Sequence, residues 1–580
     1  PTATRTPTRT PLPTATDRPR PTATPVGFYR HTKAGFSLAF PSAFTLLEEQ
    51  DSSVYLMDDK TGMILGVLSD PYDPELTLEL MAGYIIADYP ILRQSDPYEL
   101  ALGAAGLKAS ALDTTVRTTS GSRVDIQVIY YENGKRFYCL TMVGEQGFQQ
   151  KQAAYLEKVY SSFAVFPPSV FDLPPDRTLG LLGGDPTRED LDPQLTTGGI
   201  YSYAGLLFAG LVRLDQDMNI LPDLAEDWTI SADGTVYTFT LRTDLTFADG
   251  YYLTAEDVIY SWDRAADPET DSPTYNTYLG DIVGVAERHA GEADTIAGLR
   301  SVGERTLVVT LDAPKPYFLL KLTYPVAFVV DRRDVEKGGK DWMYSPNASG
   351  PYRVEEYVEM EKLVFSVNKR YHTPPAIPYI GYLLNPQGSP ISRYEDDSLD
   401  IVGVGGETAL RVRRAEDPLH AELHSVPGLC TTFIAMSNTL PPFDDPKVRQ
   451  AFLLAFDRDI YNQRIDRGLN LPALSLLPPA MPGYLAENAV PTYDPEAAKA
   501  ALAESRYAGE MPEVILETAG FGGEEDSLIS ALADMWRKTL GIDIRVVFLD
   551  PINYSEAALE YPAQLSASGW CADYPDPQNF

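Results

Sequence analysis

Cysteine and histidine are scarce in this chain of 580 residues, which has three cysteines and five histidines. Zinc and related metals are usually held by clusters of these two residue types. His420 and His424 lie four residues apart, but a metal needs at least a third ligand, and the stretch DPLHAELHSVPG around them looks extended. We therefore expect two surface histidines and no metal site, with a metal pair as the less favoured alternative.

Positive charge is also in short supply. The chain has 47 Lys and Arg against 82 Asp and Glu, which gives a formal net charge of −35 at pH 7. Such a chain repels phosphate backbones and anionic lipid headgroups, so nucleic acid is excluded as an expected partner. The acidic excess indicates solubility outside the cell more readily than a dedicated acidic docking face.

Long apolar runs and catalytic signatures are missing as well. No run of about 18 apolar residues is present, so no membrane-spanning helix is predicted. The chain has no GxxxxGK[ST], GxSxG or HExxH motif, and in GVGGET at 403–408 Thr408 stands where a nucleotide-binding loop needs glycine. The sequence thus offers no catalytic residue and no cofactor site. A hydrolase that uses an unmarked carboxylate pair stays open as an alternative.

The composition and length of the chain predict several folded domains joined by Pro-rich segments. Its 44% hydrophobic and 22% charged residues are typical of globular proteins, and 580 residues exceed a single core. Residues 1–27 consist mainly of Pro and Thr, which predicts a disordered stalk or an inert tail. VFPPSVFDLPPDR at 165–177 predicts a linker, which we place at 167–177.

Residues 28–166 predict a small α+β sandwich. Strands are expected at GFSLAF, SSVYLMDD and MILGVLSD, followed by a hairpin that turns at Asn133-Gly134 and holds a buried Cys139. LTLELMAGYIIADYPIL and FQQKQAAYLEKVYSSFAVF have helical spacing of apolar residues. The stretches YRHTKAGFSLAFPSAF and YLEKVYSSFAVF resemble those of PsbP-like domains.

Residues 178–580 alternate strand and helix patterns, which predicts mixed α/β lobes. An Asp249-Gly250 turn leads to a helix whose Thr254 and Asp257 have capping-box spacing. Asp445 and Pro446 are expected to start another helix, and SLISALADMWRKTL predicts a helix that stops at Gly541 before a strand. The expected apolar face of the helix after Asp445 consists of Val448, Phe452, Ala455, Phe456 and Ile460.

Five blocks in this region occur in the order of one family. They are TLGLLGGDPTREDLDPQL, LLFAGLVRLDQDMNILPDLAEDWTISADGTVYTFTLRTDLTFADGYYLTAEDVIYSW, NASGPYRVEEYVEMEKLVFSVNKRYH, TTFIAMSNTLPPFDDPKVRQAFLLAFDRDIY and GWCADYPDPQNF. They resemble the peptide-type solute-binding proteins of ABC importers. The resemblance implies a two-lobed periplasmic-binding-protein fold, with mixed sheets and helices, that encloses a ligand for a membrane permease.

The same resemblance sets the expected lobes, with lobe I at 178–430 and lobe II at 431–580. Ser349-Gly350-Pro351-Tyr352 resembles the rigid GPY turn at the hinge. Because the family pattern continues beyond GWCADYPDPQNF, lobe II is expected to be incomplete at Phe580.

The last block supplies the expected ligand residues. In peptide-binding members of the family, the Asp at the position of Asp573 holds the ligand's free α-ammonium; the alternative is a loop Asp that caps a turn before Pro575. Trp570 and Tyr574 are expected either to wall a ligand side chain or to fill core. Cys430 and Cys571 match positions that are joined by a disulfide in some oligopeptide-binding relatives, and an exported compartment permits that bond.

On the first lobe, Thr197 and Gly198 follow the family's first strand and are expected at the cleft rim, unless they form only a turn before a core helix. Together these features predict a monomeric, extracytoplasmic binding protein for peptides or related small amine-bearing ligands. It would be periplasmic or membrane-anchored, with any signal peptide or lipid-attachment Cys ahead of Pro1. A surface sensor or adhesion protein that works through residues 28–166 is the alternative function.

Overall fold

The structure is a computed structural model, and it describes residues 28–580 apart from 32, 40–43, 51, 59–61, 72–75, 105, 134–135, 166–170, 172, 200–201, 386–388, 486–489, 520–526 and 550–562. The expected stalk, Gly134 and part of the expected linker lie outside the described residues. The chain forms two compact units: Pro1–Asp185 with Tyr352–Lys369 and Thr373–Gly403, and Pro186–Pro351 with Arg370–His372 and Val404–Phe580. The predicted domain boundaries stay predictions.

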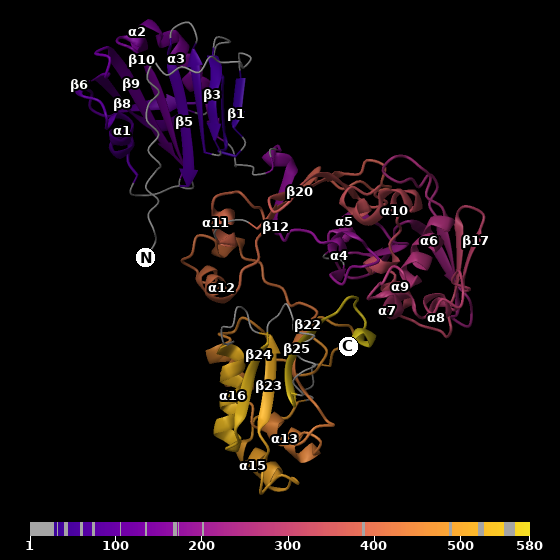
Figure 1. Cartoon of the computed structure of the whole chain (residues 1–580). Helices are drawn as coiled ribbons and strands as arrows, with labels where there is room; N and C mark the ends of the chain where they lie inside the picture. The colour runs from indigo at the N-terminus through magenta and orange to yellow at the C-terminus, as the bar shows by residue number, and fades with distance from the viewer. Residues whose placement is uncertain are drawn as a thin grey trace. The chain divides into compact units, whose positions relative to one another are not determined.

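The N-terminal part of the first unit is an α+β sandwich (Figure 1). One sheet has the order β3-β4-β5-β10-β9-β8-β6, with β7 also on β8, and a smaller sheet has the order β1-β2-β11. The strands are β1 (Phe28–His31), β2 (Phe36–Ala39), β3 (Phe44–Gln50), β4 (Ser53–Asp58), β5 (Ile64–Pro71), β6 (Ile91–Gln94), β7 (Tyr98–Leu102), β8 (Leu107–Arg117), β9 (Arg123–Glu132), β10 (Arg136–Glu145) and β11 (Ala164–Val165), and the helices are α1 (Leu78–Ile86), α2 (Phe148–Lys151) and α3 (Ala153–Ser162).

Both faces of the large sheet are covered. One cluster of buried side chains joins β4, β5 and β10 to β2 and α3, and it includes Phe36, Leu140 and Leu156. A second cluster joins the opposite face to α1. The predicted hairpin is confirmed by the antiparallel β9 and β10, and Cys139 is buried as expected. The alternation of apolar residues thus produced the layers that the sequence predicted.

A four-stranded sheet of order β12-β21-β20-β19 completes the first unit, with β12 parallel to β21. Its elements are η1 (Pro175–Arg177), β12 (Thr178–Gly183), β19 (Tyr352–Val358), β20 (Lys362–Val367), β21 (Tyr379–Leu384) and α11 (Pro390–Glu395). Phe171, from the expected linker, is buried with Val364 and Leu399, and its ring lies where a Cβ on Gly381 would be. The linker therefore also contributes core to this sheet.

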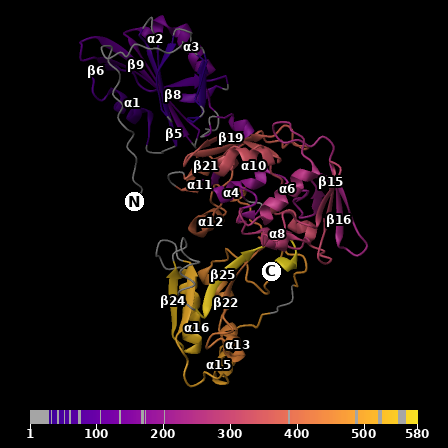
Figure 2. The same ribbon diagram turned by 45° about the vertical axis from the view of Figure 1, so that its right-hand side comes forward.

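In the second unit, residues 186–351 build a sheet of order β15-β16-β18-β17 beside a group of helices. Figure 2 shows β15 and β16 next to α6. The elements are α4 (Arg188–Leu191), α5 (Ala204–Leu207), β13 (Val212–Leu214), β14 (Ile220–Pro222), β15 (Ala225–Ile230), β16 (Val236–Leu241), α6 (Ala255–Ala266), α7 (Tyr275–Leu279), α8 (Val285–His289), β17 (Leu299–Val302), β18 (Thr306–Thr310), α9 (Phe318–Lys321), η3 (Pro325–Ala327), α10 (Arg332–Gly338) and η4 (Gly339–Tyr344).

Residues 404–580 build the sheet β22-β25-β23-β24, in which β23 is parallel to both β24 and β25. Helices α13, α15 and α16 pack on it through a shared apolar core. The elements are α12 (Gly406–Val412), η5 (His420–Glu422), β22 (Cys430–Met436), α13 (Pro446–Leu454), α14 (Arg458–Ile460), η6 (Tyr461–Ile465), α15 (Pro495–Ala503), β23 (Val514–Ala519), α16 (Ser527–Leu540), β24 (Ile544–Leu549), β25 (Leu565–Cys571) and η8 (Pro577–Asn579).

The helix starts predicted from local sequence are confirmed for α6 and α13. Thr254 and Asp257 form the predicted capping box of α6, and Asp445 caps α13 with Pro446 at its first position. Helix α13 ends at Leu454, however, so the expected apolar face does not reach Ile460, which is 46% exposed. Placing Ile460 on that face was wrong because the helix ends before it and a new one begins after Asp457.

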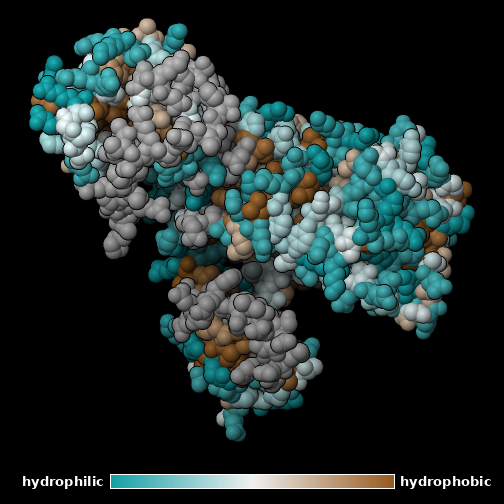
Figure 3. Space-filling model, turned by 45° about the horizontal axis from the view of Figure 1, so that its top comes forward, coloured by the Kyte–Doolittle hydropathy of each residue, from teal (hydrophilic) through white to brown (hydrophobic). Residues whose placement is uncertain are grey.

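Hydrophilic residues make up most of the described surface on the face that Figure 3 shows, in keeping with the excess of acidic side chains. Within the described ranges, none of the helices has both the length and the apolar character needed to cross a membrane.

Candidate ligand-binding site

The site is built on the strand β25 and the loop that follows it. Strand β25 pairs antiparallel with β22, which places Cys571 directly opposite Cys430, and a disulfide joins the two. The next backbone N–H, from Ala572, donates to the carbonyl of Leu429 at 2.9 Å. The chain is thus held firmly up to the residue before Asp573. This cysteine pair is the one that the family resemblance implied.

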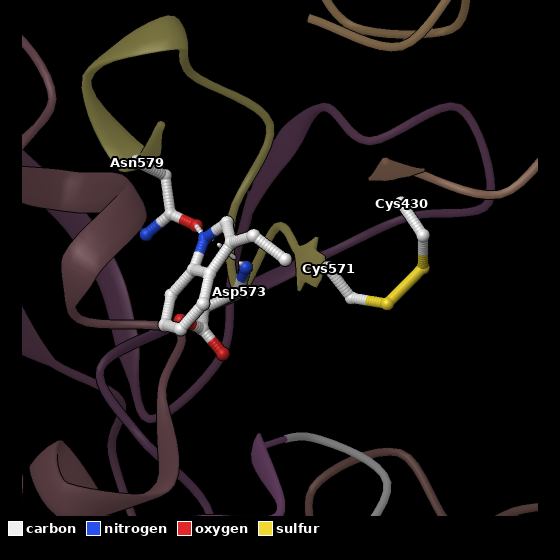
Figure 4. The surroundings of a disulfide bond; sticks show 5 residues. Cys430, Cys571, Asp573 and Asn579 are labelled. Atoms are coloured by element: carbon white, nitrogen blue, oxygen red, sulfur yellow. Dashed lines mark hydrogen bonds between the residues drawn. A yellow bond between two sulfur atoms is a disulfide. The ribbon is translucent and has the colours of Figure 1, made fainter. Parts of the chain in front are cut away.

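The loop after Cys571 is closed by the side chain of Asn579. Its Oδ1 accepts hydrogen bonds from the indole Nε1–H of Trp570 at 2.9 Å and from the backbone N–H of Asp573 at 3.0 Å. Figure 4 shows the Asn579 side chain directed toward Asp573 beside the disulfide. One amide oxygen therefore ties the end of the strand to the loop.

The Asp573 carboxylate points at aromatic residues of the 186–351 region. Its Oδ2 accepts a hydrogen bond from the hydroxyl of Tyr278 at 2.7 Å. The ring of Tyr278, on α7, stacks on Tyr324 with centroids 3.7 Å apart and planes only 8° from parallel. Tyr278 and Tyr324 are both buried, so they form a fixed wall against which the carboxylate rests.

The carboxylate of Asp573 is half-buried and lacks a cationic partner among the described residues. Burial raises its pKa, and the hydrogen bonds from Tyr278 and Asn579 oppose this only in part. Burial and the Asp573 charge also raise the pKa of Tyr278, and they raise the pKa of Tyr324 to about 12. Both phenols are therefore neutral at physiological pH. A charged carboxylate flanked by neutral rings favours a cation that can donate hydrogen bonds.

Gly199 borders the second carboxylate oxygen. It adopts the left-handed conformation with φ of +58°, and a Cβ there would lie 3.7 Å from Oδ1 of Asp573 and 3.4 Å from the Tyr324 ring. Thr197 and Gly198 are both exposed, and the N–H of Gly198 donates to Thr196 Oγ1. The glycine beside Asp573 is thus Gly199, which the sequence interpretation missed. The pair of glycines in TTGGI was the available signal.

The two aromatic residues of the block lie in different surroundings. Tyr574 is 2% exposed, belongs to the core of the 186–351 region, and meets Tyr278 edge-on with centroids 6.2 Å apart. Tyr574 thus packs against the Tyr278–Tyr324 wall. Trp570, in contrast, is 46% exposed.

The two histidines considered as metal ligands are both exposed. His420 begins η5, and its Nδ1 lies 3.2 Å from the carbonyl oxygen of Val412. Across the described ranges, the side chains of His, Cys, Asp and Glu do not gather in groups of three or more that could hold a metal ion.

Comparison with known proteins decides the family. The family model of bacterial extracellular solute-binding proteins, family 5, middle region, matches residues 219–580, which is more than half of the chain. The chain belongs to this family. The region that matches contains Tyr278, Tyr324 and Asp573, so most of the site lies within the part that defines family 5.

Curated relatives agree with the assignment to family 5. The periplasmic oligopeptide-binding protein OppA of Escherichia coli is 31% identical over 408 residues, which are 68% of this chain and 74% of the relative. The probable deoxycholate-binding periplasmic protein YgiS of Escherichia coli is 32% identical over 67% of this chain and 75% of the relative.

Solved structures show the same fold. The murein tripeptide binding protein MppA of Escherichia coli superposes with a TM-score of 0.57 at 27% identity, over 70% of this chain and 81% of that chain. An oligopeptide-binding protein of Borrelia burgdorferi gives the same values. The two-lobed fold predicted for the family 5 region is thus confirmed.

Proposed function

We propose that this protein captures peptides or related small amine-bearing ligands as the solute-binding component of an ABC importer. It works outside the cytoplasm as a monomer, either periplasmic or anchored to the membrane. The lobes close on the ligand by hinge motion, and the ligand passes unaltered to the permease, so the protein binds and does not catalyse.

The observation that carries this proposal is the half-buried Asp573 carboxylate, which has Tyr278 on one oxygen and Gly199 next to the other. An α-ammonium brings positive charge and three N–H donors to a point where the described residues supply no cation. Trp570, Thr197 and Gly198 are exposed and would border the bound ligand.

The names of the relatives cover more than one ligand class, since OppA is an oligopeptide-binding protein and YgiS a probable deoxycholate-binding one. Deoxycholate is an anion and would meet the unpaired Asp573 carboxylate with like charge. The charge at this site therefore favours the amine-bearing class.

Titration calorimetry with a tripeptide such as Ala-Ala-Ala and its N-acetylated form tests the proposal. The free-amine peptide is expected to bind more tightly, and Asp573→Ala should cost about 2–5 kcal/mol of its binding free energy because the ammonium would then be buried without a partner. Asp217→Ala, which removes an exposed carboxylate, is the matched control and should leave binding unchanged. Equal binding of both peptides, or an undiminished affinity in Asp573→Ala, would refute the ammonium role.

A further inference from the structure

We propose that Asn579 is a positioning residue for ligand binding, because it sets the Asp573 carboxylate where it meets the ligand's ammonium. The inference rests on the proposed function and adds to it a residue that does not itself touch the ligand.

The backbone between Cys571 and Asp573 shows why such a residue is needed. Cys571 is held by the sheet and the disulfide, and Ala572 by its hydrogen bond to Leu429. At Asp573 the chain leaves the sheet, and its N–H is taken up by Oδ1 of Asn579 at 3.0 Å. This hydrogen bond therefore orients the peptide unit from which the Asp573 side chain projects.

Asn579 is itself fixed within the same short segment. The carboxylate of Asp576 accepts the N–H of Gln578 at 2.8 Å, and the carbonyl of Asp576 accepts the N–H of Asn579 at 3.0 Å. The turn η8 thus presents the Asn579 side chain back toward the strand. We call the hydrogen bonds from Trp570 and Asp573 to Asn579 the Asn579 clamp. All three of its residues lie within a segment of ten residues.

The chemistry of the clamp requires a particular side chain. One oxygen must accept two N–H groups at once, from Trp570 and from Asp573, which an amide oxygen does with its two lone pairs. The Asn579 side chain also lowers the pKa of the Asp573 carboxyl, against the effect of burial. It therefore favours the ionised form that an ammonium binds.

Two substitutions separate positioning from general support. Asn579→Leu keeps the size of the side chain and removes the acceptor, whereas Asn579→Asp keeps an acceptor oxygen for both N–H groups. Calorimetry with Ala-Ala-Ala and its N-acetylated form is combined with the Trp570 indole N–H signal in a nitrogen–proton correlation spectrum, identified by its loss in Trp570→Phe. Asn219→Leu, which removes an exposed amide that donates to Asp215, is the control.

Asn579→Leu is expected to weaken Ala-Ala-Ala binding about tenfold, as for a lost hydrogen bond that orients a charged group, and to leave binding of the acetylated peptide unchanged. The Trp570 signal should move in Asn579→Leu and return in Asn579→Asp. Unchanged Ala-Ala-Ala affinity in Asn579→Leu, an equal loss for both peptides, or an unmoved Trp570 signal would each overturn the positioning role. A wild-type protein that does not distinguish the two peptides would instead overturn the proposed function.

Discussion

Two half-buried carboxylates occur in different parts of this molecule, Asp573 in the family 5 region and Asp113 on β8 of the sandwich. Each accepts a hydrogen bond from a tyrosine, Tyr278 in one case and Tyr98 in the other. Burial is the main cause of a raised pKa in both, and neither is paired with a cation within the described part of the chain. By local electrostatics alone, the two would count as equal candidates for a binding site.

The two carboxylates differ in how many of their oxygen atoms already accept a hydrogen bond from the protein. At Asp113, Oδ2 accepts from Tyr98 at 3.1 Å and Oδ1 accepts from Nε2 of Gln149 at 2.8 Å, while Gln127 donates to the Tyr98 hydroxyl. At Asp573, Tyr278 donates to Oδ2, the Asn579 side chain also hydrogen-bonds to the carboxyl group, and Oδ1 lies next to Gly199. Each oxygen of Asp113 thus has a side-chain donor within the sandwich, whereas under the proposed function a ligand's ammonium completes the hydrogen bonding of Asp573. Burial of a charge is therefore a weaker mark of a binding site than unused acceptor capacity.

The largest expected effect concerns the disulfide, which lies next to Asp573 and has no counterpart near Asp113 in the described residues. Replacing Cys430 and Cys571 by Ser should lower the free energy of unfolding of the β22–β25 sheet by up to about 4–5 kcal/mol, since the bond closes a loop of 141 residues. The sandwich should melt as before. Two resolved transitions in calorimetry, of which only one moves, would show this.

Thiol counting checks the same bond directly. The denatured protein should show one free thiol, Cys139, without reductant and three after reduction. Equal counts in the two conditions would contradict the disulfide.

The next effect is the pH dependence of binding. The affinity for a free-amine peptide should fall by up to tenfold per pH unit below the pKa of Asp573, because the protonated carboxyl no longer attracts an ammonium. The fall should begin above the ordinary Asp value of 3.8, since burial raises this pKa. Asp573→Asn should abolish the dependence and Asp113→Asn should keep it. A dependence that survives in Asp573→Asn would place the titrating group elsewhere.

The smallest effects concern stability without ligand. A carboxyl whose pKa is raised on folding stabilises the folded state at low pH, and this contribution is lost as the pH rises through the raised value. Asp573→Asn should therefore raise the melting temperature slightly at neutral pH. Asp113→Asn also removes a buried charge, but it should lower stability by about 1 kcal/mol because its new NH₂ group faces a donor, either Tyr98 or Gln149. Thermal melts in which both variants shift in the same direction would remove the proposed difference between the two carboxylates.

Much of the local structure could be predicted from the sequence. Short-range chemistry determines a capping box or an N-cap followed by proline, so the starts of α6 and α13 were correct. The apolar face expected on α13 was wrong at Ile460, because the periodic pattern continued through that residue while the chain started a new helix after Asp457.

The candidate site was predictable only in its last block. Asp573 was found because the GWCADYPDPQNF stretch resembles a family. Its hydrogen-bond partner Tyr278 is 295 residues away in the sequence, and no local pattern links the two. The sequence interpretation named Gly198 for the cleft rim and did not name Gly199, since only the tertiary structure shows that Gly199 has a positive φ and lies beside the carboxylate.

The sequence by itself determined the α/β elements, their caps and the family, because these depend on residues close together or on blocks preserved in order. The tertiary structure alone decided what surrounds Asp573. The Tyr278–Tyr324 wall and its hydrogen bond to Asp573 arise where segments far apart in the sequence pack together, and the pKa of a carboxylate depends on the atoms that surround it in space.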